Sequence, residues 1–124
     1  MNGLLSGIWI FASVIYQDRQ LPRPNPDLMM TFDFRDASND TLKYYRKNET
    51  GFCERNASYN FDGKFLTQTV TAVNPNNADF CSTDPDMNLG LTTRVPVEIK
   101  DGKIYMTFQL GEENLIYIWE RFGP

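Results

Sequence analysis

The sequence contains no histidine. Histidine titrates nearest to neutral pH and is the commonest metal ligand, so its absence removes the usual general base and most zinc sites. Neither a nucleophile paired with a base nor a glycine loop that could hold a phosphate is recognisable in the sequence. We therefore expect a protein that is not an enzyme, with no catalytic residues, no metal and no cofactor.

The sequence also lacks a basic stripe. Twelve Lys and Arg residues are interspersed among sixteen Asp and Glu residues, which gives a net charge of -4. Nucleic acids and anionic membranes attract clustered positive charge. We therefore expect no nucleic-acid partner.

An apolar stretch from Leu4 to Tyr16 is too short to cross a bilayer, and neither Lys nor Arg precedes it. We expect no transmembrane segment and interpret this stretch as the first strand of a mature domain from which an export signal has been removed.

Cysteine is scarce, with only Cys53 and Cys81. Two cysteines without histidine do not make a zinc site. A disulfide between them is the simpler interpretation and predicts an oxidising location, either secreted or periplasmic in the cell envelope. Two free thiols in a cytosolic protein are the alternative.

Strand-like segments dominate the sequence, whereas helical periodicity is nearly absent. A chain of 124 residues, 14% of them aromatic, is long enough for one core, so we predict a single domain over residues 1–124. Eight strands are expected, at Gly7–Tyr16, Leu28–Arg35, Thr41–Lys47, Phe52–Phe61, Lys64–Val73, Leu91–Ile99, Lys103–Leu110 and Asn114–Phe122.

The connections between these segments favour antiparallel pairing. Asp62-Gly63 and Asp101-Gly102 are hairpin-turn signals, and the two long connections, 17–27 and 74–90, lack the apolar spacing of a crossover helix. The predicted fold class is all-β, an eight-stranded antiparallel up-and-down barrel, because closure removes exposed edges. A sandwich or half-barrel is the alternative, and Pro96 suggests a bulge or an opening in its strand. In the meander order, Cys53 and Cys81 fall at the same end of the barrel.

Gly7-Ile8-Trp9 opens the first strand, and Arg121 lies near the end of the last. This pair resembles the G-x-W signature of lipocalins and the wider calycin group, most closely the short bacterial envelope domains. The resemblance implies a structural base in which Gly7 begins the barrel and Trp9 plugs it, with Arg121 packed across the indole ring. Two features depart from the family: no segment is left for the C-terminal helix, and the T-D-x-x-Y motif is missing, with Met87 after Thr83-Asp84 where the Tyr would be.

The strand residues in phase with Trp9 are expected to face inward, Ser13 and Ile15 among them. An eight-stranded barrel is just wide enough to be filled by side chains or to hold one small ligand, and the sequence leaves both open. We predict a ligand-binding set of inward residues formed by Phe11, Met30, Phe32, Met106, Phe108 and Tyr117.

Apolar residues also alternate on the outer side of the first and last strands: Ile8, Ile10, Ala12, Val14, Ile116, Ile118 and Phe122. In a closed barrel these faces would merge into one patch, which predicts a homodimer or another partner unless the chain covers the patch itself. Asp79, Asp84 and Asp86 in the 74–90 connection match no calcium loop and are expected to be solvated.

Two hypotheses for the function remain. The first is a non-enzymatic binding module for a small apolar or amphipathic ligand at the barrel mouth. The second is a structural or protein-interaction domain of the cell envelope with a filled barrel. A pocket at the mouth favours the first, and a covered outer face removes the reason for the second.

Overall fold

The computed structural model describes residues 2–122. Its strands form one antiparallel sheet, and three short 3-10 helices accompany them. The strands are β1 (Gly7–Tyr16), β2 (Arg19–Pro22), β3 (Leu28–Phe34), β4 (Asn39–Arg46), β5 (Cys53–Phe61), β6 (Phe65–Val73), β7 (Thr92–Lys100), β8 (Lys103–Leu110) and β9 (Glu113–Arg121). The 3-10 helices are η1 (Asn2–Leu5), η2 (Asp79–Thr83) and η3 (Pro85–Met87).

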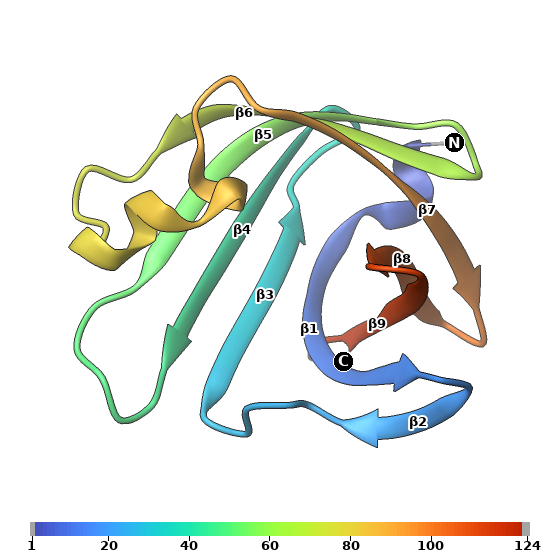
Figure 1. Ribbon diagram of the computed structural model, residues 1–124. Helices are drawn as coiled ribbons and strands as arrows, with labels where there is room; N and C mark the ends of the chain where they lie inside the picture. Colours follow the sequence, from blue (N-terminus) through green and yellow to red (C-terminus); the bar gives the residue numbers. More distant parts are fainter. Residues whose placement is uncertain (1, 123–124) are drawn as a thin grey trace.

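The sheet closes on itself. Each strand from β3 to β8 pairs with the next, β1 pairs with β3, and β1 also pairs with β9 along most of its length. This ring of eight strands, which leaves β2 outside it, confirms the predicted all-β antiparallel barrel (Figure 1). Within residues 2–122, no helix is long and apolar enough to cross a membrane.

The strand outside the ring, β2, lies in a segment that the sequence predicted to be a loop. It pairs with the second half of β1, from Ser13 to Tyr16, and forms a hairpin whose turn residues Gln17 and Asp18 have φ of 52° and 62°. A two-residue turn with both φ values positive matches the twist of a hairpin. The expectation failed because Gln-Asp is not one of the dipeptides that usually signal such a turn.

Side chains fill the closed end of the barrel. Leu5 at the end of η1 is fully buried, as is Ile104 of β8, and Trp9 donates a hydrogen bond from Nε1 to the Leu5 carbonyl at 2.8 Å. The Arg121 guanidinium lies 4.2 Å from the centre of the Trp9 ring and donates to the Ser6 carbonyl. The structure thus has the stacked Trp and Arg that the sequence resemblance implied for the base.

Gly7 allows the Arg121 side chain to pack closely at this base. Its φ is +117°, and a Cβ on it would collide with the Arg121 guanidinium. Only glycine adopts this backbone conformation at little cost, and only glycine lets the guanidinium approach so closely.

A bulge in β1 corrects the predicted inward phase. The pairing with β9 shifts between Phe11 and Ser13, so one extra residue, Ala12, is inserted in the strand. A bulge reverses the alternation beyond it. Val14, predicted to face outward, is therefore buried in the core with 2% exposure, while Ser13 and Ile15, predicted to face inward, are only partly buried.

The predicted outer patch is correspondingly smaller than expected. Val14 has moved to the interior, and Ile118 of β9 is only 1% exposed. Ile8 and Phe122, at 42% and 59% exposed, remain as its large open members.

The ladder between β7 and β8 is short. Residues 92–96 of β7 pair with β6, and from Val97 onward β7 pairs with β8 instead, over only four residue pairs. Pro96, which has no N–H for a ladder, is the last residue on the β6 side of this exchange. In the described residues the ladder ends at Val97 and Met106, so the wall opens beside this proline.

Candidate functional site

A cavity of about 200 Å³ lies inside the barrel. Its lining comes from every strand of the ring except β1: Met30, Phe32, Leu42, Arg55, Gln68, Thr93, Val95, Met106, Phe108, Tyr117 and Trp119, with Asp86 of η3 at one end. Most of these side chains are apolar or aromatic, as is usual for small-molecule sites. Val95 and Phe108 stand on the two sides of the open wall between β7 and β8, so the cavity reaches that opening.

Five of the six residues of the predicted ligand-binding set line this cavity: Met30, Phe32, Met106, Phe108 and Tyr117. Phe11 does not line it. The centre of its ring lies 4.8 Å from that of Tyr117 and 5.5 Å from that of Trp119, so Phe11 packs against two residues of the cavity lining.

A buried ion pair joins the inner faces of the adjacent strands β4 and β5, and the sequence patterning did not predict it. The Asp40 carboxylate, fully buried, accepts hydrogen bonds from the Arg55 guanidinium and from Gln68 Nε2, the latter at 2.9 Å. Burial raises the pKa of Asp40, and the nearby Arg55 charge and the Gln68 hydrogen bond oppose that shift. A signal was present: Arg55 is in phase with the inward residues Cys53 and Ala57, so strict alternation along β5 would have placed it inside.

Two polar atoms of the cavity-lining side chains have no hydrogen-bond partner. Among the described residues, Arg55 Nε and Trp119 Nε1 are the buried side-chain nitrogen and oxygen atoms left unpaired. A buried donor without an acceptor costs about 1–3 kcal/mol, so such groups are rare unless they serve a purpose. Both atoms are N–H donors that are enclosed by the surrounding side chains.

A second, wider pocket of about 660 Å³ lies at the open end of the barrel. It shares Met30, Asp86 and Tyr117 with the inner cavity, so the two spaces meet at these side chains. The remaining lining residues are Leu28, Tyr44, Arg46, Glu49, Phe80, Thr83 and Asp84. The mouth pocket is thus more polar than the cavity below it.

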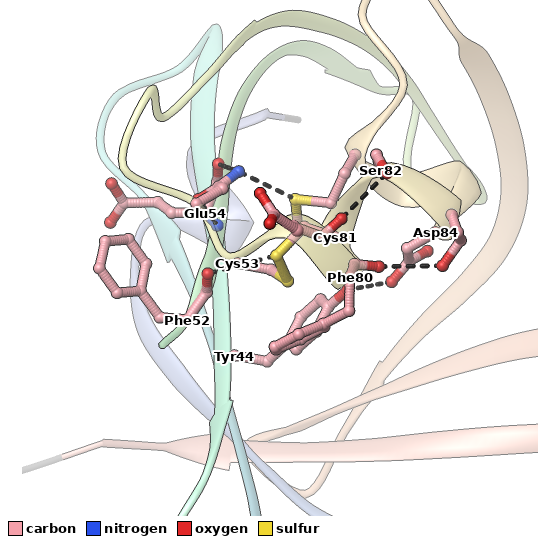
Figure 2. Close-up of a disulfide and its surroundings, with 12 residues drawn as sticks. Tyr44, Phe52, Cys53, Glu54, Phe80, Cys81, Ser82 and Asp84 are labelled. Carbon is pink, nitrogen blue, oxygen red and sulfur yellow. Dashed lines mark hydrogen bonds between the residues drawn. A yellow bond between two sulfur atoms is a disulfide. The ribbon is translucent and has the colours of Figure 1, made fainter. Parts of the chain in front are cut away.

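A disulfide pins the segment that forms one side of this mouth. Cys53, the first residue of β5, is bonded to Cys81 of η2, with 5.6 Å between their Cα atoms (Figure 2). Both cysteines are buried, and Phe80 beside them is 42% exposed. In Figure 1 the η2–η3 segment lies beside one end of β5 and β6, away from the N-terminus.

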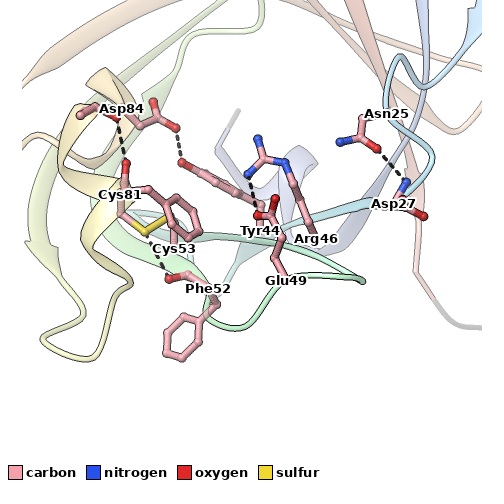
Figure 3. A network of polar contacts seen from close by, with 11 residues as sticks. Asn25, Asp27, Tyr44, Arg46, Glu49, Phe52, Cys53, Cys81 and Asp84 are labelled. Atoms are coloured by element: carbon pink, nitrogen blue, oxygen red, sulfur yellow. Dashed lines mark hydrogen bonds and ion pairs between the residues drawn. A yellow bond between two sulfur atoms is a disulfide. The ribbon is translucent and has the colours of Figure 1, made fainter.

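Hydrogen bonds fix the same segment against β4. Asp84 caps η3 by accepting from the Asp86 backbone N–H at 2.9 Å, and its other carboxylate oxygen accepts from the Tyr44 hydroxyl (Figure 3). The Asp84 backbone N–H donates to the Cys81 carbonyl at 3.0 Å. The expectation that Asp84 is simply solvated is wrong, because its carboxylate holds η3 to the barrel wall.

Negative charge gathers where the two spaces meet. The Asp86 residue is exposed as a whole, yet desolvation around its carboxyl raises its pKa, and the Asp84 carboxylate adds to the shift. Burial, followed by the charges of Asp86 and Asp84, raises the pKa of Tyr117. In residues 2–122, no cluster of three acidic or cysteine side chains is arranged to hold a metal ion.

No known protein family and no curated protein matches the sequence. Among solved structures, the chain is similar to one described as the crystal structure of the fluorescent protein UnaG, N57A mutant. The alignment covers 100% of both chains at 16% identity, with a TM-score of 0.51. The fold is calycin-like. At this identity the likeness concerns the arrangement of strands alone; the resemblance to bacterial envelope domains has no counterpart in it.

Proposed function

We propose that this calycin-like barrel is a non-enzymatic binding module that holds a small apolar or amphipathic ligand. The observation that carries the proposal is the inner cavity, lined by aromatic and aliphatic side chains and adjoining the mouth pocket at Met30, Asp86 and Tyr117. An apolar body would lie among Phe32, Met106 and Phe108, and a polar end would reach the mouth. The cavity alone is smaller than a usual small-molecule site, whereas the mouth pocket lies within the usual range of ~300–1,000 Å³.

The test is a titration with N-phenyl-1-naphthylamine, a neutral dye that brightens in apolar surroundings. We expect saturable brightening with one site. Val95→Phe, which adds volume to the cavity lining, should weaken binding at least tenfold. Val73→Phe is the matched control, because Val73 lies at the end of β6, is 38% exposed and is absent from the cavity lining. Non-saturable binding, or equal effects of the two variants, would overturn the proposal.

We also propose that the domain works in an oxidising compartment, secreted or periplasmic, because Cys53 and Cys81 are bonded to one another. The mass of protein isolated from its own host should rise by two hydrogens on reduction. Equal masses would show free thiols and contradict this location.

A homodimer through the outer side of β1 and β9 is a further proposal, which the remaining exposure of Ile8 and Phe122 supports. Light scattering tests it: the wild type should have twice the monomer mass, and Ile8→Lys should have the monomer mass. A monomeric wild type would remove the proposal, together with the main support for the alternative of an envelope interaction domain.

A further inference from the structure

The mouth pocket is lined by a carboxylate that the protein does not pair. Asp86 of η3 lines both this pocket and the inner cavity, and the residue is exposed. Its backbone N–H donates to Asp84, but no described residue donates a hydrogen bond to its own carboxylate or forms an ion pair with it. Desolvation raises the pKa of this carboxyl, so the surrounding protein has removed part of its water. The Asp86 carboxylate is therefore available to a ligand in the pocket.

The cationic side chains of the two spaces already have carboxylate partners. In the mouth pocket, Arg46 Nη1 lies 3.7 Å from Glu49 Oε2 (Figure 3). In the inner cavity, Arg55 forms its ion pair with the buried Asp40. The lining of the mouth pocket thus has one cationic side chain against three carboxylates, those of Glu49, Asp84 and Asp86. This imbalance attracts a cationic ligand and repels an anionic one.

The negative charge lies among aromatic side chains. The Asp84 carboxylate accepts a hydrogen bond from the Tyr44 hydroxyl (Figure 3). Burial is the largest cause of the raised pKa of Tyr44 and of Tyr117, and the charges of Asp84 and Asp86 add to both shifts, so both carboxylates are close to both hydroxyls. Phe80, which is 42% exposed, completes the aromatic part of the lining. Organic cations are attracted both by carboxylates and by the faces of aromatic rings.

We infer that the mouth pocket binds an amphipathic cation, an organic ammonium group that carries an apolar chain. The ammonium group donates to the Asp86 carboxylate beside Tyr117, and the charge of Asp84 adds to the attraction. The apolar chain packs along Leu28 toward Met30, where the mouth pocket adjoins the inner cavity. This inference rests on the proposed binding function and names the class of ligand.

Three probes of the same chain length separate the possible charges of the ligand. At pH 7 octylamine is a cation, octan-1-ol is neutral and octanoate is an anion. Dissociation constants are measured by displacement of N-phenyl-1-naphthylamine. Octylamine should bind about fivefold more tightly than octan-1-ol, and octanoate should bind most weakly. The inference is overturned if octylamine binds no more tightly than octan-1-ol, or if octanoate binds most tightly.

Asp86→Asn removes the charge and keeps the size of the side chain. We expect it to weaken octylamine about fivefold and to leave octan-1-ol unchanged. Asp79→Asn is the matched control: it makes the same change of charge in the neighbouring helix η2, at an exposed residue outside the lining of the mouth pocket. The control should leave the affinity for octylamine unchanged. Equal weakening by the two variants would mean that octylamine responds to the net charge of the protein and would overturn the site.

The Asp86 carboxyl of the wild type gives a second readout that needs no variant protein to fold. Its pKa is measured by NMR titration with and without a saturating probe. Octylamine should lower this pKa, because a nearby cation stabilises the carboxylate, whereas octan-1-ol should not lower it. A pKa that does not fall would overturn the inference even if the dye binds. Failure of the dye itself to bind would overturn the proposed function instead, so the two failures are distinguishable.

Discussion

The closed base and the inner cavity differ in whether the donors of their buried Trp and Arg side chains are paired. At the closed base, the Trp9 indole donates to the Leu5 carbonyl, and Arg121 donates to Ser6 while it stacks on Trp9. In the cavity that leads to the mouth, the Trp119 indole and the Arg55 Nε have no partner. Satisfied groups rigidify a structure, whereas unsatisfied ones cost stability. The comparison indicates that the buried donors of the base contribute to stability, whereas the two unpaired donors of the cavity lining reduce it.

Removal of the disulfide should cause the largest loss in the free energy of unfolding, and it should make the mouth segment more mobile. Cys53→Ala with Cys81→Ala opens a closed loop of 28 residues, for which the chain-entropy account gives about 3–4 kcal/mol. Urea unfolding followed by circular dichroism measures the loss. The reduced wild type is the control and should lose a similar amount. A loss below about 1 kcal/mol would show that the hydrogen bonds of η3 hold the mouth without the covalent bond.

Truncation of the plug tests the base. Leu5→Ala should cost about 2–4 kcal/mol, because Leu5 is fully buried and the barrel cannot close over the space it leaves. Leu4→Ala is the matched control, since Leu4 is 50% exposed, and it should change the free energy of unfolding by less than about 0.5 kcal/mol. Dye affinity should stay the same in both variants. A loss of dye binding in Leu5→Ala would show that the packing of the base and the dye affinity of the cavity are coupled.

Gly7→Ala tests the close approach at the base. The positive φ and the collision with Arg121 should together cost about 1–3 kcal/mol. Gly102→Ala is the control: Gly102 also has a positive φ, at +75°, but no atom lies near the added methyl group. Thermal unfolding should therefore show a larger loss for Gly7→Ala. Equal losses would mean that the guanidinium moves aside freely.

The smallest expected effect concerns pH at the mouth. The pKa of Asp86 lies above its usual value of 3.8, so the group gains its proton at a higher pH in the folded protein than in the unfolded chain. As the pH falls from 7 through that raised pKa toward 3.8, this group therefore adds stability. Urea unfolding measured at successive pH values from 7 downward should show this gain in the free energy of unfolding. Asp86→Asn should remove this part of the pH dependence, and an unchanged slope would exclude Asp86 as its origin.

Alternation of apolar residues was enough to predict the ring of eight strands, because each strand has one face on the core. Alternation assigned the wrong face where one inserted residue shifts the phase of a strand. The bulge at Ala12 reverses the second half of β1 and brings Val14 inward, and no residue type marks that position. The β2 hairpin was missed for a similar reason, because Gln17-Asp18 is not one of the dipeptides that usually signal a hairpin turn.

The candidate site was likewise predicted only in part. Its apolar lining follows from alternation, so five members of the predicted set lie around the cavity. The polar part does not follow from apolar patterning: Asp40, Arg55 and Gln68 are buried inward residues that apolar alternation does not identify. Arg55 and Gln68 both donate to the Asp40 carboxylate across β4, β5 and β6, and this shared acceptor is a property of the folded barrel.

The four-pair ladder between β7 and β8 has a consequence for the rate at which ligands exchange. With few hydrogen bonds to break, that side of the wall should fluctuate at a lower free-energy cost than global unfolding. The disulfide meanwhile holds the mouth segment in place. We therefore expect residence time to be set at this lateral seam, with amide hydrogen exchange faster there than in the longer β5–β6 and β8–β9 ladders. Affinity and dissociation rate would then be governed by different parts of one small barrel.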